Sequence, residues 1–145
     1  MRGFAMLLVV GCGGTGANVD AEGCDALESG SFTAITAGTT MDTTAPAVTI
    51  EGGFTITLPA GAVGFVSFDS TDDTEYALFA DRPVAINAFT PSGTEIMASA
   101  RATSTDVCTI VMRRDIIELT VGLFYLGLGP DTADINFVMR HFDPD

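Results

Sequence analysis

The sequence contains no lysine, and this absence narrows the choice of partners. All six basic residues are arginine, while Asp and Glu number 19, so the 145-residue chain has a formal net charge of -13. Binding to nucleic acid depends on clustered Lys and Arg that neutralise phosphates, so no nucleic-acid partner is expected. The acidic excess favours divalent cations or basic surfaces as partners, and adaptation to salty surroundings explains it equally well.

Histidine and tryptophan are also scarce, which argues against two kinds of site. The single histidine, His141, lies close to the last residue and has no Gly-x-Ser-x-Gly motif to accompany it, so no serine-based triad is expected. Tryptophan is absent, and Tyr76 and Tyr125 both sit in apolar runs, so sugar stacking lacks its usual side chains. We predict a protein that is not an enzyme, with hydrolysis by paired carboxylates left open.

Long apolar runs are missing as well. Phe4 to Val10 gives about seven apolar residues, whereas a helix needs roughly 20 to cross a bilayer, so this run suits a secretory signal peptide better than a membrane span. It follows Met1-Arg2-Gly3 and ends in Leu8-Val9-Val10-Gly11-Cys12. This arrangement resembles the lipobox of bacterial lipoprotein signal peptides.

The lipobox resemblance implies a location. In that family the cysteine receives a diacylglyceryl group and the chain is cleaved before it, so residues 1–11 are expected to be the signal peptide and Cys12 the lipidated residue. The lipid would anchor the protein to a membrane of the bacterial cell envelope, at the outer membrane or cell surface. The alternative is that residues 4–10 form a buried first strand and that Cys12 is an ordinary thiol.

Assigning Cys12 to the lipid leaves Cys24 and Cys108 as an even pair. Export places this pair in an oxidising compartment, where a disulfide closing a loop of roughly 85 residues contributes about 4 kcal/mol. We therefore predict a Cys24–Cys108 disulfide. The alternative is two buried free thiols in a cytosolic protein.

The residues after Cys12 are mostly small or acidic, which is typical of a flexible linker. We predict a tether over residues 12–23 and a single domain over residues 24–145. The alternative is an irregular N-terminal segment that packs on the domain.

Short apolar runs recur between turn signals along the rest of the chain, and none has a clear helical period. Phe54, Ile56 and Leu58 alternate with threonines, as in a half-buried strand. We predict an all-β fold, an antiparallel β-sandwich with a jelly-roll-like arrangement. The expected strands are residues 32–36, 47–50, 54–58, 63–68, 76–80, 84–89, 107–112, 116–121, 124–128 and 135–139.

Three short stretches carry a second resemblance: Thr57-Leu58-Pro59-Ala60-Gly61, Phe89-Thr90-Pro91-Ser92-Gly93-Thr94-Glu95 and Gly122-Leu123-Phe124-Tyr125-Leu126. Together they make residues 54–140 resemble the pre-peptidase C-terminal domain family, small β-sandwiches found beside secreted bacterial enzymes and on cell-surface proteins. The resemblance implies a noncatalytic accessory or binding module. It carries over no functional residues.

An acidic segment supplies the candidate metal ligands, Asp69, Asp72, Asp73 and Glu75. This density of oxygen ligands suits Ca²⁺, although the EF-hand spacing is absent, and a solvated acidic turn is the alternative. Asp131 and Asp134 form a second acidic loop. The one basic pair, Arg113-Arg114, is expected in a solvated turn between two strands.

These observations favour a membrane-anchored bacterial envelope or surface lipoprotein that acts as a noncatalytic binding or interaction module. Envelope or surface proteins are the expected partners, and no cofactor is expected unless Ca²⁺ binds. A calcium-stabilised adhesion or carbohydrate-binding domain and a carboxylate-dependent hydrolase are the alternatives.

Overall fold

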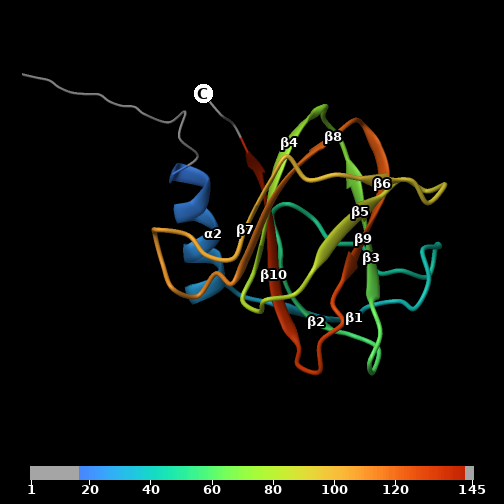
Figure 1. The fold of residues 1–145 in the computed structure, drawn as a ribbon, viewed down its shortest axis with the longest axis horizontal. Coiled ribbons are helices and arrows are strands. Elements are labelled where there is room, and N and C mark those ends of the chain that lie inside the picture. The colour runs from blue at the N-terminus through green and yellow to red at the C-terminus, as the bar shows by residue number, and fades with distance from the viewer. Residues whose placement is uncertain (1–16, 143–145) are drawn as a thin grey trace, which may run out of the picture.

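The computed structural model describes residues 17–142, which form an all-β sandwich with a helix on its outside (Figure 1). A six-stranded sheet has the order β1-β2-β10-β4-β8-β7, and a four-stranded sheet has the order β3-β9-β5-β6. Strands β1 and β2 pair in parallel, while the other neighbours described are antiparallel. The predicted all-β sandwich is confirmed. The elements are α2 (Ala17–Ser29), β1 (Thr33–Thr36), β2 (Gly53–Thr57), β3 (Gly64–Ser70), β4 (Thr74–Ala80), β5 (Ile86–Phe89), β6 (Glu95–Ile96), β7 (Ala100–Ala102), β8 (Arg113–Leu119), β9 (Gly122–Leu128) and β10 (Ile135–Phe142).

The main core lies between the two sheets. Alternate residues of a strand point to opposite faces, so every second side chain of β3, β4, β9 and β10 enters this core. The largest of these side chains are fully buried and come from both sheets, for example Tyr76, Phe137 and Leu126. The two central strands β4 and β10 are buried on their other face too, because the helix covers it.

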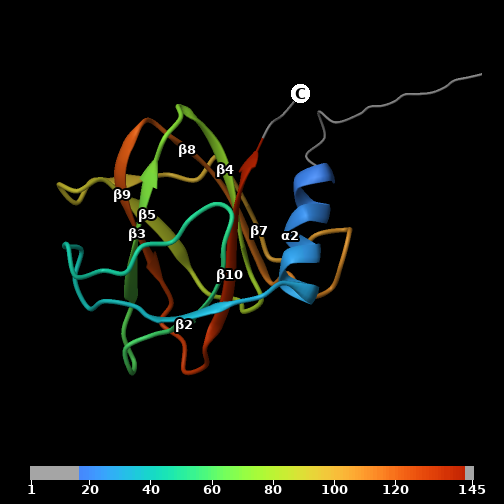
Figure 2. The same cartoon turned by 180° about the vertical axis from the view of Figure 1, so that it is seen from behind.

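Helix α2 packs on the outer face of the six-stranded sheet, opposite the four-stranded sheet (Figure 2). Its buried face includes Val19, Gly23 and Leu27, which recur every four residues as a helix requires. At Gly23 the helix backbone comes so close to the sheet that a Cβ atom would lie 2.7 Å from the ring of Phe79. Within residues 17–142 no helix is long and apolar enough to cross a membrane.

The helix differs from the expectation of a flexible tether over residues 12–23, which does not hold from residue 17 onward. A glycine at the centre of the buried face hides the helical period, because the sequence shows an apolar residue only at Val19 and Leu27 on either side of it. The proposed signal peptide, residues 1–11, and Cys12 lie outside the described residues.

Two expected strands are absent from the described structure. Residues 47–50 make only an isolated bridge, between Ala47 and Ser67. Residues 107–112 form a loop, because Cys108 and Val111 pack against α2 instead of extending a sheet. Strand β8 begins directly after this loop, at Arg113.

Candidate functional site

A groove lies at the end of the sandwich where the turn from β3 to β4 joins the two sheets. It is lined by residues 47–50 together with Phe68, Asp69, Thr71 and Tyr76, and it encloses about 270 Å³. We call it the sheet-end groove. Concave, mainly apolar sites with a few polar groups are the usual places where proteins bind small molecules. The described residues therefore offer this groove as a candidate binding site.

Backbone pairing holds one wall of the sheet-end groove in place. The amide of Ser67 in β3 donates to the carbonyl of Pro46 at 2.8 Å, and the amide of Val48 donates to the carbonyl of Ser67 at 2.9 Å. These bonds fix residues 46–48 alongside the edge of β3. The chain then crosses to the six-stranded sheet, where β2 begins at Gly53, so residues 47–50 bridge the opening between the sheets.

Two aromatic side chains form the floor of the groove. Phe68 and Tyr76 come from the end of β3 and the start of β4, and their ring centroids lie 5.1 Å apart in an edge-to-face arrangement. The Tyr76 hydroxyl lies 3.0 Å from Ser70 Oγ. The Ser70 hydroxyl in turn donates a hydrogen bond to the backbone carbonyl of Asp72 at 2.9 Å. These hydrogen bonds confirm that Tyr76 is a core residue whose hydroxyl has a partner.

Polar and charged side chains contact several residues that line the sheet-end groove. The His141 ring lies against Tyr76, with centroids 5.0 Å apart, and its Nε2 atom is 3.9 Å from an oxygen of Asp72. Arg140 donates a hydrogen bond to the carbonyl of Ile50, one of the lining residues, at 2.7 Å. Asp69 is exposed on β3 between buried Phe68 and Ser70, so its side chain points to the opposite face of the strand.

The four candidate calcium ligands do not point to a common site, because each has different surroundings. Asp73 accepts a hydrogen bond from the amide of Val121 at 2.8 Å, while Glu75 accepts one from Ser99 Oγ at 3.2 Å. Asp72 faces His141, and Asp69 lies on β3. In the part of the chain that the structure describes, no three His, Cys, Asp or Glu side chains lie together as a metal site would require.

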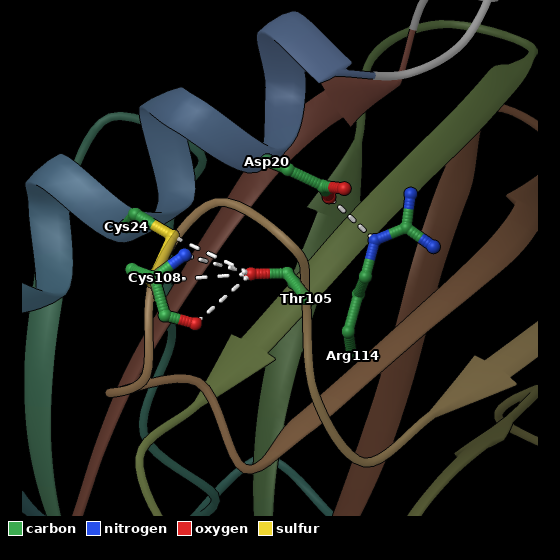
Figure 3. Close-up of a disulfide and its surroundings, with 5 residues drawn as sticks. All are labelled: Asp20, Cys24, Thr105, Cys108 and Arg114. Atoms are coloured by element: carbon green, nitrogen blue, oxygen red, sulfur yellow. Dashed lines mark hydrogen bonds and ion pairs between the residues drawn. A yellow bond between two sulfur atoms is a disulfide. The ribbon is translucent and has the colours of Figure 1, made fainter.

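The predicted disulfide is confirmed and joins Cys24 of α2 to Cys108 of the loop before β8 (Figure 3). Thr105 lies beside it, and its hydroxyl accepts a hydrogen bond from the amide of Cys108 at 3.4 Å. The bridge closes the loop between residues separated by 84 positions and fastens the helix to the outer face of the sheet. The disulfide therefore has a structural role and lies away from the sheet-end groove.

The basic pair Arg113-Arg114 is not in a solvated turn, and that expectation is wrong. Both residues begin β8, so they point to opposite faces of the sheet. Arg114 pairs with Asp20 of α2 on the outer face (Figure 3). Arg113 faces inward and makes two hydrogen bonds, at 2.8 and 3.3 Å, to the carboxylate of Asp115.

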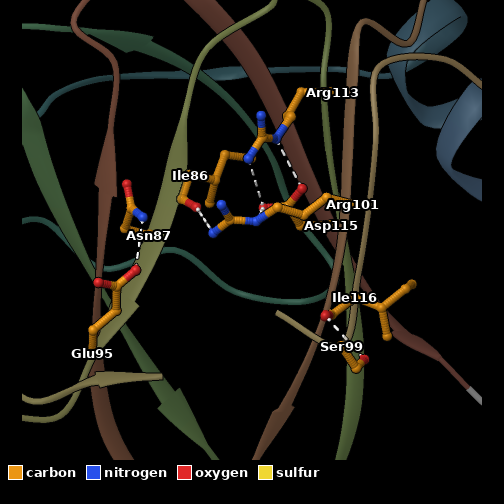
Figure 4. A network of polar contacts seen from close by, with 8 residues as sticks. All are labelled: Ile86, Asn87, Glu95, Ser99, Arg101, Arg113, Asp115 and Ile116. Atoms are coloured by element: carbon orange, nitrogen blue, oxygen red, sulfur yellow. Dashed lines mark hydrogen bonds and ion pairs between the residues drawn. The ribbon is translucent and has the colours of Figure 1, made fainter. Parts of the chain in front are cut away.

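The Asp115 carboxylate is fully buried and also meets Arg101 of β7, at 3.4 Å. Arg101 in turn donates to the carbonyl of Ile86 in β5 at 3.1 Å, so this network links the two sheets (Figure 4). Burial raises the pKa of Asp115, and the hydrogen bonds from Arg113 and the charges of both arginines oppose that rise. Sequence reasoning missed this residue because a buried aspartate has no local signature.

The second acidic loop contains one strong pair. Asp131 accepts two hydrogen bonds from Arg82, at 3.0 and 3.1 Å. These bonds, with a backbone amide of Ala133, lower the pKa of Asp131 to about 2. Through these bonds the Asp131 carboxylate holds the loop before β10 against the loop before β5.

Neither a protein family nor a curated protein sequence matches this chain. The resemblances to lipoprotein signal peptides and to the pre-peptidase C-terminal domain family therefore remain predictions from the sequence pattern. The groove, the disulfide and the charge distribution are the observations on which a function can be argued.

Proposed function

We propose that this chain is a lipid-anchored protein of a bacterial cell envelope and that its sandwich is a noncatalytic binding module. The observation that carries the proposal is the Cys24–Cys108 disulfide. Structural disulfides form and persist in oxidising compartments such as the periplasm and the cell surface, and they are rare in the cytosol. The bridge therefore supports export.

The disulfide also supports the proposed lipid anchor. It uses two of the three cysteines in the chain, which leaves Cys12 as the odd one. Cys12 follows Gly11 in the lipobox-like segment, where a thiol is the acceptor of the diacylglyceryl group. One diacylglyceryl group on Cys12 and one disulfide would account for all three cysteines.

The start of α2 and the sheet-end groove lie at the same end of the domain. Figure 1 shows the start of α2, the end of β10 and the turn from β3 to β4 together at that end. Cys12 precedes Ala17 by five residues, which span at most about 18 Å. A lipid on Cys12 would keep the groove close to the membrane surface, within reach of other envelope proteins and of small molecules there.

The intact mass of the protein recovered from membranes of its native host tests this proposal. We expect the mass of a chain that begins at lipid-modified Cys12, less two hydrogens for the disulfide. The matched variant Cys12→Ser should lose the lipid and retain the bridge. An unmodified full-length mass in the native membranes would overturn the envelope assignment.

A further inference from the structure

We propose that the sheet-end groove binds the alkyl chain of a single-chain lipid, with the polar head of that lipid left outside in solvent. This inference rests on the proposed binding function and names the class of ligand. Three observations support it: the size of the groove, the pairing of the polar groups beside it, and an apolar surface at the same end of the domain.

The size of the groove suits a short run of CH₂ groups. A cavity of about 150 Å³ with an apolar lining holds the six carbons of benzene. By this measure the groove, at about 270 Å³, has room for about ten carbons. Five of the eight lining residues have aliphatic or aromatic side chains, namely Ala47, Val48, Ile50, Phe68 and Tyr76.

The polar groups beside the lining already have partners. The Tyr76 hydroxyl lies against Ser70 Oγ, which donates to the carbonyl of Asp72. Arg140 donates to the carbonyl of Ile50. Over residues 17–142 no buried side-chain nitrogen or oxygen atom lacks a hydrogen-bond partner. The groove therefore offers a polar ligand no free buried side chain, and burial of carbon surface is the interaction that remains.

The charges near the groove have both signs, so they favour neither cations nor anions. Arg140 keeps its positive charge beside the lining, while the Asp72 carboxylate lies 3.9 Å from Nε2 of His141. Asp69 is exposed, and its side chain points to the face of β3 opposite to Phe68. An uncharged alkyl chain fits these surroundings better than a ligand with a charge inside the groove.

Two exposed apolar residues lie at the same end of the domain. Val121, in the turn between β8 and β9, is 62% exposed, and Leu123 at the start of β9 is 40% exposed. The amide of Val121 donates to Asp73 at 2.8 Å, which ties this turn to the turn from β3 to β4. An apolar surface next to the groove suits a ligand that comes from a membrane.

Binding of alkylphosphocholines to the full 145-residue chain tests the inference. The chain is made without lipid in an oxidising cell-free extract. The probes carry alkyl chains of four, six, eight, ten and twelve carbons, and each is used below its micelle concentration. Affinities and contact positions come from changes in the backbone amide NMR spectrum.

We expect the affinity to rise about fourfold for each added CH₂ group, because each one buries more carbon surface. The rise should end at about ten carbons, where the groove is full. The shifted amides should be those of residues 47–50 and of the β3–β4 turn.

The charge of the head group should matter little. At about 150 mM salt, octyltrimethylammonium and octyl sulfate should bind within about threefold of octylphosphocholine, because their heads lie in solvent where salt screens the net charge of the protein. A preference of more than about tenfold for either charged head would overturn the alkyl chain as the part that is recognised.

Two variants reduce the space in the groove from different segments. Thr49→Trp and Thr71→Trp each place a large side chain at an exposed lining position, so the affinity should level off at shorter chains. Decylphosphocholine should bind about tenfold more weakly to each variant, and butylphosphocholine nearly as before. Thr43→Trp, at an exposed position outside the lining, is the matched control and should leave the whole series unchanged.

The outcomes separate this inference from the proposed function. An affinity that does not depend on chain length, or that still rises from ten to twelve carbons, would overturn the inference. Amide shifts away from the groove, or absence of binding by every probe, would overturn it too. The mass measurement decides the envelope location independently, so an unmodified mass together with the expected chain-length series would overturn only that location.

Discussion

The two faces of the six-stranded sheet are covered in different ways. Twenty buried hydrophobic residues form the cluster on its inner face, shared with the four-stranded sheet, whereas eight form the cluster under helix α2 among the residues described. The inner cluster is held by apolar packing over whole strands. The outer cluster needs a covalent bond, because α2 brings only Val19, Cys24 and Leu27 to it as buried side chains.

This difference shows how a short helix is kept on a sheet. A 13-residue helix is marginally stable in water, so tertiary contacts must supply its stability. Here a close approach at Gly23, the Cys24–Cys108 bridge and the Asp20–Arg114 pair replace a broad apolar face. The inner face depends on close packing, with the Arg113–Asp115–Arg101 network as an additional link between the two sheets.

Truncation of an inner-face side chain should have the largest effect. Phe137 is fully buried on β10, so Phe137→Ala should lower the free energy of unfolding by about 4–5 kcal/mol through lost burial and an empty cavity. Denaturant titration measures this. The exposed Leu123→Ala on β9 is the control and should change stability by less than about 0.5 kcal/mol. A loss below about 2 kcal/mol for Phe137→Ala would contradict the comparison.

Removal of the disulfide should come next. Replacing Cys24 and Cys108 together by Ser should lower the free energy of unfolding by about 3–4 kcal/mol, because the bridge restricts a long loop in the unfolded chain. Hydrogen exchange should then rise more at the amides of α2 than at those of β4 and β10, which packing holds from within. Equal acceleration in the helix and in the central strands would show that the outer face does not depend on the bridge.

Disruption of the buried ion pair on the inner face should have the third-largest effect on stability. Arg113→Met leaves the buried carboxylate of Asp115 with the more exposed Arg101 as its partner, so we expect a loss of about 2–3 kcal/mol in unfolding free energy. Arg101→Met removes the longer contact and should cost less than about 1 kcal/mol. If the two variants were equally destabilised, the network would not be centred on Arg113.

The ion pair of the outer face should contribute less. Asp20→Asn removes the partner of Arg114 and should cost about 0.5–1 kcal/mol, with the cost shrinking at high salt. Asp25→Asn, an exposed carboxylate in the same helix, is the matched control and should leave stability unchanged. A double-mutant cycle with Arg114→Met measures the coupling, and a coupling of zero would remove this pair from the fastening of α2.

The ion pair between Arg82 and Asp131 joins two loops and lies outside both hydrophobic clusters, so its effect on stability can be compared with theirs. The folded-state pKa of Asp131 is lowered to about 2, below the usual value of about 4 in an unfolded chain. Its contribution to stability is therefore complete above pH 4 and is lost as the pH falls toward 2. The pH dependence of unfolding between these limits should flatten in Asp131→Asn, and an unchanged slope would contradict the assigned pair.

Several parts of the fold follow from local pattern. The alternation of Phe54, Ile56 and Thr residues predicts β2, and the apolar run at Tyr76 to Ala80 predicts a strand of the central pair. The strand boundaries near the disulfide do not follow, because Val111 is apolar in either setting and only its contact with α2 shows that it belongs to a loop. The sheet-end groove does not follow from the sequence either, because its lining combines residues 47–50 with residues from the end of β3, the turn after it and the start of β4.

Apolar residues that alternate between turn signals were enough to predict that this acidic chain forms a β-sandwich, because alternation is a local property. The Cys24–Cys108 pair followed from the sequence once Cys12 was assigned to a lipid anchor. Tertiary structure decided three things: that residues 17–29 form a helix, that Arg113 and Arg114 face opposite partners, and that an apolar groove opens at one end. Each depends on which strands become neighbours. That choice is made by contacts between residues far apart in the chain, which a sequence pattern does not record.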